Sequence, residues 1–221
     1  MKKDYEKMRS GRENIITIFY RPFVEMIAKI LVKTKITPNQ ITTIGIFISI
    51  IAGFFFALGE WKYLIIGSIL TQCVLISDML DGKVARYKKL GTVFGEWYDG
   101  IANKIFKYTL FLGATIGAYR ISGDPLILII GAVATFNMTM ISFILYLKPL
   151  FNFSKGHTEL PRLKGLEIPF GFLTLVGLSI FALFNILNLY LWFFAIFGTL
   201  GWIKQIYSNY KLGKKYNKSK T

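Results

Sequence analysis

The sequence predicts an all-α, polytopic membrane protein with six transmembrane helices, preceded by an N-terminal interfacial amphipathic helix. Of its 221 residues, 53% are hydrophobic and 16% are aromatic, which is typical of membrane proteins and enough for one domain. The hydrophobic residues are gathered in long runs between short polar or basic turns, and a bilayer-spanning helix needs about 20 such residues.

The N-terminal segment is set apart by its mixed character. We expect residues 1–36 to be cytoplasmic and interfacial, residues 37–210 to form the membrane domain, and residues 211–221 to form a basic tail. Within residues 14–32, apolar side chains recur at helical spacing against basic ones, and Pro22 predicts a break or a helix start. This pattern favours a helix lying in the membrane interface. An amphipathic helix packed on a protein surface is the alternative.

The first transmembrane helix has a clear start. Thr37 can cap it, Pro38 suits its first turn, and Gln40 occupies the capping-box position. The apolar run that follows, residues 41–58, is long enough to span. We expect further spans near residues 63–86, 92–118, 126–147, 170–186 and 189–203, and a partly disordered tail from residue 204. In the fourth span, Asn137, Thr139 and Ser142 are potential interhelical hydrogen-bond partners.

The formal charge of +15 is distributed asymmetrically. On the six-span layout, all but two of the 27 Lys and Arg residues lie on one side, the exceptions being Lys62 and Arg120. The positive-inside rule makes that side cytoplasmic and predicts a multi-pass protein of the cell membrane with both termini in the cytoplasm. The positive charge is therefore explained by membrane orientation and by attraction to anionic lipid head groups. No nucleic-acid partner is expected.

Acidic residues stand beside or within the apolar runs, where a carboxylate costs several kcal/mol unless it faces water, a metal or a cation. Asp78 and Asp81 share one helix face, and Gly95, Asp99 and Asn103 follow one another at steps of four on the next helix. Two such helices side by side would direct three carboxylates into one gap. Such a site suits Mg²⁺ or Mn²⁺ completed by substrate phosphates. A buried structural network of carboxylates and arginine is the alternative.

These residues form the pattern D-x2-D-G-x2-A-R-x8-G-x3-D. It resembles the signature of the CDP-alcohol phosphotransferases, membrane enzymes that make phospholipid head-group linkages. Seven positions match at fixed spacing, and the surrounding hydropathy fits the helical membrane fold of that family. They are Asp78, Asp81, Gly82, Ala85, Arg86, Gly95 and Asp99.

The resemblance implies transfer of a phosphatidyl-like group from a CDP-linked lipid donor to a small polar acceptor alcohol, with release of CMP. Asp78, Asp81 and Asp99 would hold two Mg²⁺ or Mn²⁺ ions, and Arg86 would contact phosphate oxygens, which a planar guanidinium does well. Family members form homodimers, so a homodimer is expected. The resemblance places the nucleotide beside the small residues Gly82, Ala85 and Gly95, and near Asn39 and Thr42, for which helix capping is an equal alternative.

Asn103 departs from the family, which has a fourth aspartate here, taken as the general base for the acceptor hydroxyl. An amide cannot accept that proton. The residue is explained by an introduced Asp-to-Asn change, by a divergent or weakened enzyme, or by a protein that binds metal and CDP-alcohol without turnover. Glu96 is the substitute carboxylate to examine, although it could instead be an interfacial glutamate paired with Lys or Arg. A transporter is disfavoured because the charges cluster at one face.

The acceptor is least defined by the sequence. The many basic residues of the expected cytoplasmic face, among them Lys104 and Lys107, slightly favour a sugar- or polyol-phosphate acceptor. Arg162 and Lys164 are the predicted acceptor-binding residues. Positive-inside topology alone would supply the same charges.

Overall fold

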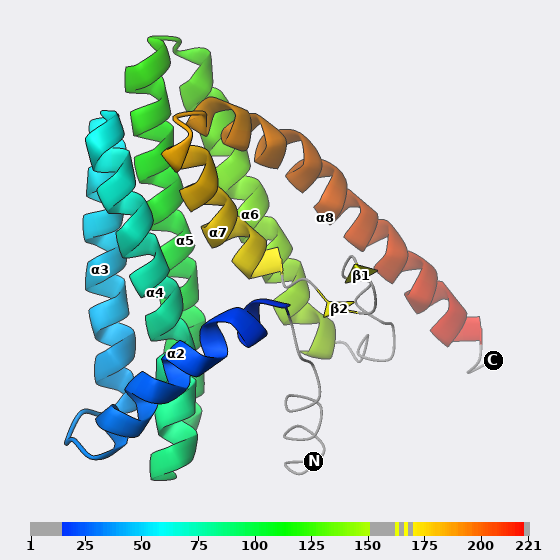
Figure 1. Cartoon of the computed structure of the whole chain (residues 1–221). Coiled ribbons are helices and arrows are strands. Elements are labelled where there is room, and N and C mark those ends of the chain that lie inside the picture. The colour runs from blue at the N-terminus through cyan, green and yellow to red at the C-terminus, as the bar shows by residue number, and fades with distance from the viewer. Residues whose placement is uncertain (1–14, 151–161, 164–165, 168–169, 219–221) are drawn as a thin grey trace.

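The computed structural model describes residues 15–150, 162–163, 166–167 and 170–218, and this part of the chain is helical apart from two short strands and the connecting turns (Figure 1). The two strands, β1 (Arg162–Leu163) and β2 (Leu166–Glu167), have two residues each and pair antiparallel; in the chain they lie between the fifth and sixth of the described helices. The helices are α2 (Ile15–Val32), α3 (Pro38–Leu58), α4 (Trp61–Lys88), α5 (Val93–Ser122), α6 (Leu126–Leu150), α7 (Phe170–Leu183) and α8 (Leu187–Lys218).

Helices α3 to α7 run side by side as a bundle, and α2 crosses the bundle axis (Figure 1). Four helices of the described chain are long and apolar enough to cross a membrane: α3, α4, residues 126–144 of α6 and residues 187–211 of α8. These four helices support the prediction of an all-α polytopic membrane protein. They do not confirm the six spans that the sequence predicts. Helix α5 carries acidic and basic residues through its first half, and the described apolar part of α7, residues 174–183, is short.

Two boundary predictions were wrong. Pro22 lies inside α2, which is one continuous helix from Ile15 to Val32. The last helix does not end near residue 203 but continues to Lys218, so the basic residues beyond 203 are helical as far as the structure describes them. The predicted start of α3 is confirmed: Thr37 and Gln40 form a capping box, with the proline in the first turn.

Helices α3 and α5 approach until their backbones touch. A Cβ built on Gly113 would lie 2.1 Å from the carbonyl oxygen of Gly53, and one on Gly117 would lie 2.0 Å from that of Phe56. Only glycine permits this separation at both positions. Gly113 and Gly117 are four residues apart, which is the small-xxx-small spacing that brings membrane helices into close contact.

Asn137 joins α6 to α8 and is almost fully buried. Its amide nitrogen donates to the carbonyl oxygens of Phe194 and Ala195 at 3.0 and 2.9 Å, and its oxygen accepts from Trp202 Nε1 at 2.9 Å. The predicted interhelical role is therefore confirmed for Asn137. Thr139 instead donates to a carbonyl of its own helix.

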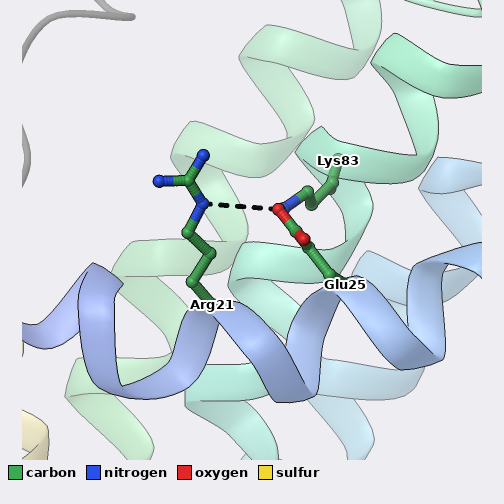
Figure 2. A network of polar contacts seen from close by, with 3 residues as sticks. All are labelled: Arg21, Glu25 and Lys83. Carbon is green, nitrogen blue, oxygen red and sulfur yellow. Dashed lines mark hydrogen bonds and ion pairs between the residues drawn. The ribbon is translucent and has the colours of Figure 1, made fainter.

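Helix α2 is attached to α4 by an ion-pair cluster (Figure 2). Glu25 Oε1 accepts from Lys83 Nζ at 2.7 Å and from Arg21 Nε at 3.3 Å. The hydrogen bond from Lys83, followed by that from Arg21, holds the pKa of Glu25 below its usual value of 4.5. Lys88 adds a second attachment, donating to the carbonyl oxygens of Thr34 and Ile36 at 2.7 and 2.6 Å. The turn before α3 is thereby held against the end of α4.

Candidate active site

The two halves of the acidic motif meet because the connection between α4 and α5 is short. Helix α4 ends at Lys88, and the next residue, Lys89, caps it in a left-handed conformation with φ of 56°. Helix α5 begins after Thr92, whose hydroxyl accepts from the backbone N–H of Gly95 at 3.0 Å. The chain therefore reverses within a few residues, and the last turns of α4 lie beside the first turns of α5.

Asn103 bridges the two helices. Its amide nitrogen donates to Asp78 Oδ1 at 2.6 Å and to Asp99 Oδ1 at 3.1 Å. All three side chains are half-buried. The spacing argument that placed these residues in one gap agrees with this geometry. The amide supplies the hydrogen-bond donor that two neighbouring carboxylates need.

Asp81 is directed toward a third helix. It is 5% exposed, and its Oδ2 accepts from Thr42 Oγ1 of α3 at 2.6 Å. Asp78 and Asp99 are both close enough to Asp81 to act on it electrostatically. Thr42 therefore lies within the acidic cluster and contacts it directly, which a capping residue would not do.

The glycines of the motif have different surroundings. A Cβ on Gly82 would meet only Arg86 Nη1, at 3.6 Å, so this glycine borders open space beneath the guanidinium. A Cβ on Gly95 would lie 3.1 Å from Thr92 Oγ1 and 3.2 Å from Asn39 Oδ1, which is tight. Asn39 is thus beside the motif, as Thr42 is. The capping box before α3 uses neither of them.

The acidic cluster offers oxygen donors of the type that Mg²⁺ and Mn²⁺ prefer. Among the described residues, no three His, Cys, Asp or Glu side chains are already gathered closely enough to hold a metal ion. Instead, Asn103 lies between Asp78 and Asp99, and Asp81 is bonded to Thr42. Mutually repelling carboxylates separate in this way unless a cation lies between them. The donor set fits a divalent cation.

The remaining predicted residues are less constrained. Ala85 is half-buried, and Arg86, the next residue of α4, is exposed. The side chain of Glu96 is exposed and makes no hydrogen bond or ion pair with any residue that the structure describes, so its role as substitute base stays a prediction. Arg162 lies in β1, but its side chain is outside the described set, as is the whole of Lys164.

The sequence did not predict the contact of Tyr98 with α3, and it named Lys107 only as one of several basic residues. Tyr98 Oη lies 2.9 Å from Thr43 Oγ1, joining α5 to α3. Lys107, one helical turn after Asn103, is half-buried and is attracted electrostatically by Asp78. Its position four residues after Asn103 was the available signal, because the two share a helix face.

Fold and site together define a helical membrane protein with an acidic motif divided between two antiparallel helices. The chain belongs to the CDP-alcohol phosphatidyltransferase family, whose model matches residues 35–206.

Curated relatives include two enzymes of inositol phospholipid synthesis. The chain is 36% identical over 88 residues to the phosphatidylinositol phosphate synthase of Corynebacterium glutamicum, covering 40% of this chain and 39% of that protein. It is 31% identical over 94 residues to the archaetidylinositol phosphate synthase of Pyrococcus horikoshii, covering 42% and 48%. The matched segments therefore span less than half the length of these relatives.

Solved structures share the fold. The phosphatidylinositol phosphate synthase of Mycobacterium tuberculosis with CDP-DAG bound superposes with a TM-score of 0.66 at 21% identity, covering 83% of this chain and 92% of that one. The same enzyme in complex with manganese and citrate gives a TM-score of 0.66 at 22% identity, covering 83% and 87%.

Proposed function

We propose that this protein transfers a phosphatidyl-like group from a CDP-linked lipid to the hydroxyl of a small polar acceptor, releasing CMP. The observation that carries the proposal is the bridge from Asp78 through Asn103 to Asp99, with Asp81 adjoining it. The acidic cluster has Arg86 and the open side of Gly82 at its edge. Membership of the family and the CDP-DAG bound to a structural neighbour support this donor class.

Asp78, Asp81 and Asp99 would hold two divalent cations, Mg²⁺ or Mn²⁺, consistent with the manganese bound to a structural neighbour. When bound, such ions neutralise the pyrophosphate and the leaving CMP. Thr42 fixes the orientation of Asp81 by its hydrogen bond. Asn39 and Gly95 would line the nucleotide beside the cluster.

In the reaction, the acceptor hydroxyl oxygen attacks the phosphorus that carries the lipid, the phosphoanhydride bond to CMP breaks, and the hydroxyl proton is lost. Arg86 is suited to contact two phosphate oxygens at once, because its guanidinium is a planar fork. Gly82 has no side chain, so the pyrophosphate could approach the α4 backbone at this position. These contacts would orient the donor so that the acceptor hydroxyl attacks the phosphorus from the side opposite the leaving CMP.

Asn103 supports a second candidate function, a protein that binds metal and CDP-alcohol with weak turnover or none. Its amide donates to both flanking aspartates and cannot accept a proton from the acceptor. Glu96 would be the base in an active enzyme that lacks the fourth aspartate. The transferase remains the leading proposal because every other motif position is present.

The membrane setting follows from the charge distribution. We place the protein in the cell membrane with both termini cytoplasmic, as a multi-pass homodimer of the kind that the family resemblance implies. Helix α2 would lie in the interface, since Phe19, Phe23, Met26 and Ile30 form an exposed apolar stripe along it. The inositol phosphate relatives favour a polyol-phosphate acceptor, with Arg162 and Lys164 as its predicted ligands.

Binding and turnover can be separated by experiment. Calorimetric titration of the full chain with a CDP-lipid analogue should show binding that requires Mg²⁺ and is lost in Asp78→Asn, Asp81→Asn and Asp99→Asn. Release of CMP, followed by mass spectrometry, then distinguishes the transferase from the binding protein. Unchanged affinity in all three variants would refute the site.

A further inference from the structure

Helix α2 packs on the parts of α3 and α4 that carry the hydrogen bond between Thr42 and Asp81. Five buried apolar side chains from the three helices form one cluster: Val24, Ala28, Ile41, Leu80 and Val84. Ile41 of α3 directly precedes Thr42 in the chain, and Leu80 of α4 directly precedes Asp81. The position of α2 and of the connection that follows it is therefore linked to the geometry of the acidic cluster.

Lys88, the last residue of α4, fixes the connection between α2 and α3. Its ammonium group donates to the carbonyl oxygens of Thr34 and Ile36 at 2.7 and 2.6 Å. The connection covers only residues 33–37, and Ile36 adjoins Thr37, the N-cap of α3. The start of α3 therefore cannot shift relative to the end of α4 without loss of these two hydrogen bonds.

The start of α3 needs this attachment because the backbone contact of α3 with α5 lies near the other end of the helix, at Gly53 and Phe56. Its early turns carry Thr42, which donates to Asp81 Oδ2 at 2.6 Å. The hydrogen-bond partner of a carboxylate orients the oxygens that a metal ion would bind, and loss of such a partner typically weakens metal binding by roughly 10–100-fold. A displaced α3 start would act on Asp81 in this way.

Other contacts hold α2 on α4 without Lys88. Glu25 accepts from Lys83 Nζ at 2.7 Å (Figure 2), and Tyr20 donates to the side chain of Gln72. Loss of the Lys88 side chain should therefore release the α2–α3 connection while α2 stays attached. The bundle itself should remain folded.

We infer that Lys88 is a positioning residue for the proposed reaction. By holding the α2–α3 connection on the end of α4, it keeps the hydroxyl of Thr42 on Asp81 and thereby sets the affinity of the acidic cluster for a divalent cation and for CDP. The inference rests on the proposed function, which requires that the acidic cluster binds both. Lys88 acts through Thr42 and not by contact with the substrate.

The test is binding of Mn²⁺ to the full chain in neutral detergent, followed by the electron paramagnetic resonance of the free ion, and then calorimetric titration with CDP in the presence of Mn²⁺. Lys88→Met should raise the Kd for Mn²⁺ about tenfold, the low end of the expected range because the effect is indirect. Lys88→Arg keeps a charged donor and should bind as the parent does. Lys89→Met is the matched control, since the exposed side chain of Lys89 makes no hydrogen bond or ion pair with the described residues. A cooperative melt above the assay temperature verifies folding, and Lys88→Gln replaces Lys88→Met if that variant does not fold.

A double-mutant cycle tests the route through Thr42. Thr42→Val removes the hydroxyl and should itself weaken Mn²⁺ binding; adding Lys88→Met to Thr42→Val should then change the Kd little, because coupled residues are not additive. A merely structural role would lower the Tm and leave the Kd of the folded protein unchanged.

Unchanged affinities in Lys88→Met, an equal loss in Lys89→Met, no recovery in Lys88→Arg, or additive losses with Thr42→Val would each overturn the inference. These outcomes leave the proposed function intact, since the parent chain still binds Mn²⁺ and CDP. A parent chain that binds neither would refute the proposed function and the inference with it.

Discussion

Replacing Asn103 by aspartate changes the site in a way whose size can be worked from the structure. The substitution removes two hydrogen bonds that the amide donates, to Asp78 at 2.6 Å and to Asp99 at 3.1 Å. It also places a further carboxylate between two existing ones. Without metal, the variant should therefore be less stable than the parent chain.

Hydrogen bonds to charged groups contribute about 1.5–3 kcal/mol each. The three side chains are only half-buried, so the lower end of that range applies, and the two bonds sum to about 3 kcal/mol. For a chain of this length, 1 kcal/mol corresponds to about 2–4 °C in Tm, so Asn103→Asp should melt about 6–12 °C lower in chelator.

Divalent metal should reverse this loss. A cation at 100 times its Kd stabilises the folded state by about 2.7 kcal/mol, and the added carboxylate should increase its affinity. The Mg²⁺-dependent rise in Tm is therefore expected to be larger in Asn103→Asp than in the parent. If the aspartate also acts as general base, release of CMP should increase by about 10²–10⁴-fold.

The assays are a thermal melt in detergent with chelator or Mg²⁺, and mass-spectrometric detection of CMP with a CDP-lipid and a polyol phosphate. Asn103→Ala is the matched control, since it removes the same hydrogen bonds without adding a carboxylate. Equal melting of the parent and Asn103→Asp under both conditions would refute the structural reasoning. A Mg²⁺-stabilised Asn103→Asp that still releases no CMP would favour a binding protein.

Three further predictions concern membrane topology, helix packing and pH. Cysteines at Ser122 and Gly91, in a cysteine-free background, should react with an impermeant maleimide from opposite sides of the membrane; reaction from the same side would contradict the expected topology. Gly113→Ala should destabilise the fold by about 1–3 kcal/mol through overpacking, whereas Gly100→Ala, with no neighbour within 4 Å, should not; equal denaturation curves would contradict backbone contact. Since the folded-state pKa of Glu25 is lowered, its stabilisation is present above its unfolded pKa and lost as pH falls through the folded value. The Tm of the parent should thus fall more than that of Glu25→Gln between pH 5 and pH 3, and parallel melting profiles would argue against the ion pair.

Much of the fold follows from local rules. The capping box before α3 and the apolar runs of α3 and α4 depend on neighbours within a few residues, so their positions could be predicted. The meeting of Asp78 and Asp99 was also predictable, because helix periodicity and a short connection leave few alternatives. Local rules were insufficient where helices ended. The break expected at Pro22 is absent, and α8 continues well beyond its apolar residues.

Contacts between distant segments could not be derived from spacing. Thr42 is 39 residues from Asp81, and nothing in the run around it specifies which carboxylate its hydroxyl contacts. Asn39 reaches Gly95 only because α3 packs on α5. Each such contact requires the packing of the whole bundle.

The backbone contact between α3 and α5 determines which parts of the bundle can move. Carbonyl groups of α3 rest against Gly113 and Gly117 without intervening side chains, so neither helix can slide or rotate without a steric clash. Thr42 and Asn39 at one end of α3, and Asp99 at the start of α5, are carried on this rigid pair. The CDP-linked lipid of the proposed reaction would nevertheless have to enter and leave. A lateral opening for it would then form between other helices, with α3 and α5 as the stationary frame.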